Sequence, residues 1–179
     1  MSHVNRGLPL SSSRTEQVFP TLTPAQIRRI AAHGRMRAIQ PGEVLVEQGE
    51  STVPFFVVVS GELELVRPSA AAETLVTVHA PGQFTGEVST LSGRRALFRL
   101  RAAKTGEVIE LDRQRMLALV QTDAELGEIL MRAFILRRVE LVAAGVGDVV
   151  LVGSTHSAVI DSASDEDSVY QIVSLFVSV

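Results

Sequence analysis

The stretch from Gly82 to Ala102, with the sequence GQFTGEVSTLSGRRALFRLRA, holds residue types that could bind an anion. Gly82 and Gly86 flank a short turn, and Glu87 follows directly. A tight glycine turn that leads into a helix directs backbone N–H groups and the positive end of the helix dipole at one point, which suits an anion. A carboxylate beside that point can accept hydrogen bonds from sugar hydroxyls. The stretch therefore predicts a site for an anionic ligand that carries hydroxyl groups.

The same stretch is locally basic. Residues 86–105 carry a net charge of +4, because they hold one carboxylate, Glu87, and five cations: Arg94, Arg95, Arg99, Arg101 and Lys104. Such a local positive charge could attract a phosphate. Arg99 and Arg101 alternate with apolar residues, so a strand would direct both of them to solvent. For Arg94 and Arg95, a ligand contact and an ordinary surface position both stay open.

The composition indicates one domain of ordinary size. The chain has 179 residues, of which 46% are hydrophobic, enough to bury a core. The formal net charge of -3 gives no global attraction to nucleic acid or to an anionic membrane. Cysteine is absent, which excludes disulfides and cysteine-ligated metals. No apolar run is long enough for a signal peptide or a membrane span, so we expect a cytoplasmic protein without a membrane partner.

The predicted elements are typical of a mainly β domain with flanking helices. Residues 19–34 predict one amphipathic helix, with Thr23 as the N-cap, Pro24 at the first helical position and Gly34 at the end. From Arg35 the apolar period changes to two, in short runs that glycine and proline separate. This pattern favours an antiparallel sandwich or barrel, and we expect a double-stranded β-helix, or jelly roll. One hairpin is expected at FFVVVSGELEL, with Gly61 at its turn.

Two helices are predicted after the strands, the first over DRQRMLALVQ and the second, the closing helix, over residues 123–144. The apolar residues of the closing helix fall into two stripes. One stripe contains Leu126, Ile129, Leu130, Ala133 and Phe134, and the other contains Met131, Ile135, Val139 and Val142. One small barrel covers only one stripe, so we expect the second to pair with its own copy in a homodimer. Burial of both stripes within one monomer is the alternative.

The two ends of the chain differ from this organisation. Residues 1–18 are polar and aperiodic, so we expect a mobile arm, with order beginning at Phe19 and the domain covering residues 19–144. Residues 145–179 form a tail with a short predicted strand, DVVLVGS, then an acidic stretch and a final apolar run. That run could add an edge strand or occupy a partner's groove. A truncated or foreign segment is an equal alternative, above all for residues 159–179.

Residues 19–144 resemble the cyclic-nucleotide-binding domain, the sensor domain of catabolite-activator-type regulators. The resemblance rests on the segments FPTLTPAQIRRIA, PGEVLVEQGE, FFVVVSGELEL and PGQFTGEVSTLSG. It implies a jelly roll that binds cAMP or another anionic nucleotide, with Glu87 holding the ribose 2′-hydroxyl. The segments ILMRAFILRRVEL and GVGDVVLVGSTHSA look like the N-terminal regulatory domain of a thioredoxin-reductase-like flavoprotein. That likeness implies a fused or separate redox effector.

The phosphate-binding arginine of this family falls on Ala96 in this sequence, and the small or hydroxyl-bearing position after it falls on Leu97. Arg95 is one residue away, but in an extended segment that offset turns a side chain to the opposite face unless a bulge intervenes. The resemblance therefore implies weakened cyclic nucleotide binding. The predicted ligand-binding residues are Gly86, Glu87, Val88, Ser89, Arg94, Arg95, Ala96 and Leu97.

Other function classes are disfavoured. Residues 139–179 contain six acidic residues and no Lys or Arg, so we predict no nucleic-acid partner. The four histidines lack metal-ligand spacing and no nucleophile motif is present, so we predict no metal site, no cofactor and no enzyme. We expect a regulatory ligand-binding domain that passes occupancy through its C-terminal helices to a dimer interface or an effector. The alternative is a degenerate dimerisation or docking module that binds no nucleotide, and a metal-free jelly-roll enzyme ranks third.

Overall fold

The computed structural model describes residues 15–143. Most of the predicted arm and the whole predicted tail, residues 145–179, lie outside these described residues. Residues 15–18 form a helical turn, and the side chain of Val18 is only 1% exposed. The described structure therefore includes helical residues before Phe19, the position at which the sequence predicts that order begins.

Helix α2, Pro24–Ala31, forms where the sequence predicts it. The Thr23 hydroxyl accepts a hydrogen bond from the backbone N–H of Gln26 at 3.3 Å, and the Gln26 side chain accepts one from the Thr23 N–H at 2.8 Å. This reciprocal capping box satisfies two N–H groups that a helix start leaves unpaired. Ile30 on the inner face of the helix is fully buried, which fixes α2 on the core.

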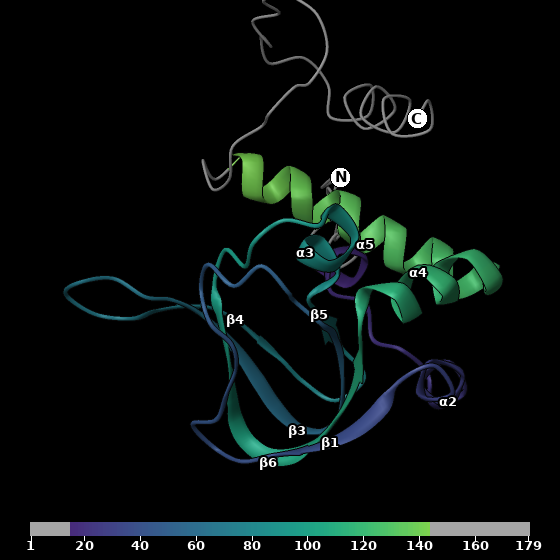
Figure 1. Ribbon diagram of the computed structural model, residues 1–179, viewed down its shortest axis with the longest axis horizontal. Coiled ribbons are helices and arrows are strands. Elements are labelled where there is room, and N and C mark those ends of the chain that lie inside the picture. Colours follow the sequence, from purple (N-terminus) through teal and green to yellow (C-terminus); the bar gives the residue numbers. More distant parts are fainter. Residues whose placement is uncertain (1–14, 144–179) are drawn as a thin grey trace, which may run out of the picture. The chain divides into compact units, whose positions relative to one another are not determined.

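Six strands form one antiparallel sheet that rolls up, with α2 beside it (Figure 1). Their order is β1-β6-β3-β4, while β2 pairs with β6 and β5 pairs with β3. The strands are β1, Arg35–Ile39; β2, Val44–Val46; β3, Phe55–Arg67; β4, Thr74–His79; β5, Phe84–Thr85; and β6, Arg99–Leu111. The prediction of a mainly β jelly roll with an N-terminal helix and two C-terminal helices is confirmed.

The hairpin predicted at FFVVVSGELEL is wrong. This segment lies within the single strand β3, which pairs with β6 on both sides of Gly61. Gly61, at φ 78°, faces Gly106 where the register between the two strands shifts, and a Cβ on Gly106 would lie 2.1 Å from the carbonyl oxygen of Ser60. The two glycines therefore allow β3 and β6 to bend together at close range, and the chain does not turn back at Gly61 as it would in a hairpin.

Three further helices gather at one end of the sheet (Figure 1). They are α3, Glu87–Ser92; α4, Arg113–Thr122; and α5, Ala124–Ala143. Helices α4 and α5 match the two helices predicted after the strands. No helix among residues 15–143 is long and apolar enough to cross a membrane.

Strand β3 separates two hydrophobic clusters because its side chains alternate between its faces. Phe55 and Val57 join the cluster that also contains residues of α2, α4 and α5. Phe56 and Val58 join the cluster inside the roll, and all four side chains are fully buried. The first cluster fixes the helices on the sheet, and the second fills the roll.

The two apolar stripes of α5 are covered to different degrees. In the first stripe Leu126, Leu130 and Ala133 are fully buried against the sheet and α4. In the second stripe Met131, Ile135 and Val139 are half-buried, and Val142 is 40% exposed. The monomer therefore covers the first stripe and leaves apolar surface on the second.

Candidate ligand-binding site

A cavity of about 420 Å³ lies between the rolled sheet, α3 and the C-terminal part of α5. This volume is in the usual range for a small-molecule site. Six of the eight predicted ligand-binding residues line it: Gly86, Glu87, Val88, Ser89, Ala96 and Leu97. Arg94 and Arg95 are not among the lining residues. The structure thus brings most of the predicted site together but leaves out its two arginines.

The turn into α3 requires glycine at position 86. Gly86 has φ 92°, and a Cβ there would lie 2.2 Å from the carbonyl oxygen of Pro54. The Thr90 hydroxyl, one helical turn later, contacts the carbonyl oxygen of Val53 at 2.7 Å. These contacts hold α3 against the segment before β3, so that Glu87, the first residue of α3, lines the cavity with only 1% of its surface exposed.

Glu87 is paired with an arginine of α5. Nη1 of Arg137 donates to Oε1 of Glu87 at 2.7 Å, and Arg137 is itself only 9% exposed. The same guanidinium donates to the carbonyl oxygens of Val18 at 2.8 Å and Phe84 at 3.1 Å, and its carbon lies 4.9 Å from the ring centres of both Phe19 and Phe84. Arg137 thus joins the N-terminal segment, β5 and α3 to the closing helix.

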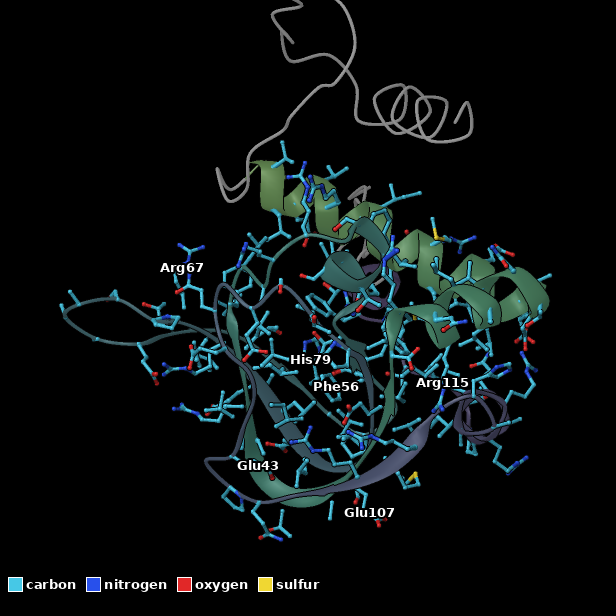
Figure 2. The ribbon with its side chains drawn as sticks, in the orientation of Figure 1. Glu43, Phe56, Arg67, His79, Glu107 and Arg115 are labelled. Atoms are coloured by element: carbon cyan, nitrogen blue, oxygen red, sulfur yellow. The ribbon has the colours of Figure 1, made fainter. Side chains whose placement is uncertain are left out.

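His79, the last residue of β4, also lines the cavity and is 1% exposed. Figure 2 labels it in the interior of the domain. Burial, and then the positive charge of Arg137, lowers the pKa of His79 to about 3. Its imidazole is therefore neutral at physiological pH, with one nitrogen that donates and one that accepts.

The wall formed by Ala96 and Leu97 is apolar. Ala96 is held in place by its backbone, since its N–H donates to the carbonyl oxygen of Glu50 and its own carbonyl oxygen accepts from the N–H of Gly49, both at 2.8 Å. Its methyl group belongs to the hydrophobic cluster inside the roll, together with Leu100. Position 96 therefore presents a methyl group to the cavity and no cation.

The two arginines before Ala96 point elsewhere. Nη1 of Arg95 donates to the carbonyl oxygen of Gly49 at 2.9 Å, which ties the side chain to the neighbouring turn. Arg94 lies near Arg138 of α5. The pKa of Arg138 is lowered first by burial and then by the positive charge of Arg94. The side chain of Arg95 is thus directed to the turn at Gly49 and away from the cavity.

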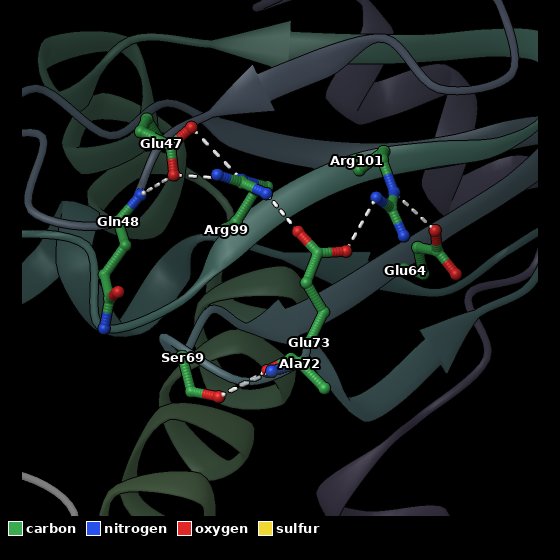
Figure 3. A network of polar contacts seen from close by, with 8 residues as sticks. All are labelled: Glu47, Gln48, Glu64, Ser69, Ala72, Glu73, Arg99 and Arg101. Atoms are coloured by element: carbon green, nitrogen blue, oxygen red, sulfur yellow. Dashed lines mark hydrogen bonds and ion pairs between the residues drawn. The ribbon is translucent and has the colours of Figure 1, made fainter.

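Arg99 and Arg101 belong to an ion-pair network on the outer surface of the sheet (Figure 3). Arg99 contacts Glu47 at 2.9 Å and also pairs with Glu73, while Arg101 contacts Glu73 at 2.9 Å and Glu64 at 2.6 Å. The solvent-facing prediction for both arginines is confirmed. The matching carboxylates come from distant strands and loops, and they offset the charges of Arg99 and Arg101 within the local +4.

Residues 36–123 match the family model described as the cyclic nucleotide-binding domain. These residues belong to the cyclic nucleotide-binding domain family. The match covers β1 to the end of α4 and includes the turn at Gly86 and the wall at Ala96. The family resemblance read from the sequence is therefore confirmed.

Curated relatives that match this chain include plant potassium channels. Potassium channel AKT1 of Oryza sativa subsp. indica is 32% identical over 118 residues, which is 66% of this chain and 13% of the channel. Potassium channel AKT6 of Arabidopsis thaliana is 30% identical over 91 residues, 51% of this chain and 10% of the channel. The chain thus spans only a small part of the length of these channels.

Solved structures share the fold. The Catabolite Activator Protein of Thermus thermophilus superposes with a TM-score of 0.58 and 23% identity, over 72% of this chain and 60% of that one. A protein from a cyclic-GMP-dependent signalling pathway that regulates bacterial phytopathogenesis superposes with a TM-score of 0.54 and 25% identity. The superposition covers 72% of this chain and 98% of that one. The matched family model describes a ligand-binding domain, which agrees with the prediction of a regulatory ligand-binding domain. Within residues 15–143 no group of three or more His, Cys, Asp or Glu side chains could hold a metal ion.

Arg137 and His79 are among the polar lining residues of the cavity that reasoning from the sequence missed. Arg137 follows Leu130 by seven residues, so helical spacing places it on the buried stripe of α5, a signal that could have identified it. His79 ends a strand directly before the Pro81-Gly82 turn, and nothing in its spacing shows that it is buried. Only the paired strands reveal its position, because Leu63 of β3 lies opposite it.

Proposed function

We propose that this domain is a regulatory sensor that binds cAMP or another nucleotide in the cavity beside Gly86 and Glu87. The family of residues 36–123 supports this function. So does the shared fold with the cAMP-bound form of the EAL enzyme Bd1971, at a TM-score of 0.50 and 18% identity, over 62% of this chain and 29% of that one. The cavity volume of about 420 Å³ suits a ligand of this size.

The contact between Glu87 and Arg137 carries the proposal. It lies in the wall of the cavity and connects the first residue of α3 to the closing helix at 2.7 Å. Glu140 and Leu141 of α5 also line the cavity. A ligand that bonds to Glu87 therefore changes the surroundings of Arg137 directly, so that occupancy and the position of α5 are coupled.

Such a coupling works as a relay when α5 has two arrangements with different ligand affinities. The side of α5 away from the sheet carries the half-buried second stripe, and we infer that it forms the interface of a homodimer. The dimer or an attached effector, fused or separate, would then read the shift of α5. A redox effector of the thioredoxin-reductase type stays a prediction from the sequence.

Isothermal titration calorimetry with cAMP and cGMP tests the binding. We expect the wild type to bind at least one of them, and Glu87→Gln to lose binding because its amide accepts fewer hydrogen bonds and carries no charge. Arg95→Ala is the matched control, since Arg95 points to Gly49, and its affinity should equal that of the wild type. If the folded wild type shows no heat of binding with either nucleotide, the proposed sensor function is wrong.

A docking or dimerisation module that binds no nucleotide is the second candidate. The apolar wall at Ala96 and Leu97 favours it, because position 96 offers a methyl group to a phosphate and no cation. The same titration separates the two functions, since this module would stay dimeric and bind neither nucleotide.

The second stripe of α5 predicts the oligomeric state. The double variant Ile135→Asp and Val139→Asp places two charges on the proposed interface, and we expect it to sediment as a monomer while the wild type sediments as a dimer. Arg132→Ala changes an exposed residue of the same helix and serves as the control. Sedimentation velocity measures the mass, and an unchanged mass of the double variant would exclude this interface.

A further inference from the structure

Three residues of the cavity keep buried polar atoms that no protein group bonds. Among residues 15–143 the buried side-chain nitrogen and oxygen atoms without a hydrogen-bond partner are both ring nitrogens of His79, Oε2 of Glu87 and Nη2 of Arg137. All three residues line the cavity. Buried polar groups in folded proteins almost always have partners, so an unpartnered group beside a cavity indicates a partner that enters it.

These polar groups lie close together. Glu87 and Arg137 are bonded at 2.7 Å, and the charge of Arg137 acts on His79. The ring of Phe19 lies 6.0 Å from the ring of His79 and 4.9 Å from the guanidinium carbon of Arg137. One end of the cavity therefore combines a neutral imidazole, a carboxylate oxygen and a guanidinium N–H around one aromatic ring.

The charges of the cavity balance. Its charged lining residues are two cations, Arg67 and Arg137, and two anions, Glu87 and Glu140. The charge of Arg137 is already offset by Glu87, and Arg67 is an exposed residue whose guanidinium carbon lies 5.5 Å from the ring centre of Phe98. An anion beside the apolar Ala96 wall would gain no partner from that wall, and solvent would screen its attraction to the exposed Arg67.

We propose that this cavity recognises an uncharged, hydroxyl-bearing heteroaromatic ligand of the nucleoside class, held by His79, Oε2 of Glu87 and Nη2 of Arg137, and that a phosphate adds little to its affinity. The proposal rests on the proposed function, because it assigns the part of a nucleotide that the same site reads. The chemistry matches, since the imidazole offers one donor and one acceptor, the carboxylate accepts and the guanidinium donates. Sugar hydroxyls and base edges need this combination.

A comparison of two ligands on the wild-type chain tests the proposal. We expect the dissociation constants of adenosine and cAMP, measured by calorimetry in one buffer, to agree within about threefold, since a phosphate without a charged partner contributes little. Guanosine and cGMP form a second pair for the same comparison. A cyclic nucleotide that binds more than about tenfold tighter than its nucleoside would overturn the proposal and leave the sensor function intact. If none of the four ligands binds, the sensor function itself fails.

Variants of His79 test its part in recognition. His79→Leu keeps the buried volume apolar, and we expect it to weaken adenosine and cAMP equally, by about tenfold, because a hydrogen-bonding partner of the ligand is lost. His79→Gln keeps one donor and one acceptor and should restore most of the affinity. The thermal midpoint of ligand-free His79→Leu should equal or exceed that of the wild type, which shows that the variant folds. Unchanged affinities in a folded His79→Leu would exclude His79 from the site.

Discussion

Replacing Ala96 with arginine is expected to raise the affinity of this domain for cAMP by about ten- to a hundredfold. The gain follows from one charge-assisted contact to the phosphate, worth about 1.5–3 kcal/mol, at about 1.4 kcal/mol for each tenfold change in affinity. Position 96 lies in the wall of the cavity, so a longer side chain there can extend into it. Calorimetry of wild type and variant with cAMP measures the effect.

The controls separate charge from size. Ala96→Met fills similar space without a charge, and its affinity for cAMP should not rise. The affinity of Ala96→Arg for adenosine should not rise either, because adenosine has no phosphate for the new guanidinium. A gain for both ligands, or for neither, would show that position 96 does not face the phosphate.

Replacing Arg137 with methionine is expected to lower the free energy of unfolding by about 3–5 kcal/mol. The variant leaves the carboxylate of Glu87 buried and without its partner, and it also removes the bonds to the carbonyl oxygens of Val18 and Phe84. Urea unfolding followed by circular dichroism, at one fixed protein concentration, measures the loss.

The double variant Arg137→Met with Glu87→Gln is the control for this effect. It removes both charges, and replacing a whole buried pair costs far less than removing one member. We therefore expect the double variant to be more stable than Arg137→Met alone. A loss below about 1 kcal/mol for the single variant would mean that the pair does not hold α5 to the domain.

Much of the fold could be predicted from local patterns. The cap at Thr23 and the change of period after Gly34 identify α2 and the strands that follow it. The hairpin at Gly61 could not be excluded in the same way, because a glycine at positive φ suits a turn and a bend equally. Only the pairing of β3 with β6 on both sides of Gly61 decides between them.

Only part of the site could be predicted, because its residues come from segments that are distant in the sequence. Glu87 and Ala96 lie in one continuous cassette, and the family resemblance of that cassette relates both of them to the ligand site. The partner of Glu87 lies 50 residues later on α5, and no local pattern connects the two. The ion pairs of Arg99 could not be predicted from its own segment either, because Glu47 and Glu73 come from other parts of the chain.

A nuclear magnetic resonance titration of the ¹⁵N-labelled chain with cAMP tests most directly whether this cavity is the ligand site and whether it is coupled to α5. We expect the largest amide shift changes at residues 86–89 and 96–97, with further changes at residues 137–141, because these segments line the cavity. Changes confined to the outer ion-pair network of Arg99 and Arg101, or no change at saturating cAMP, would contradict the account.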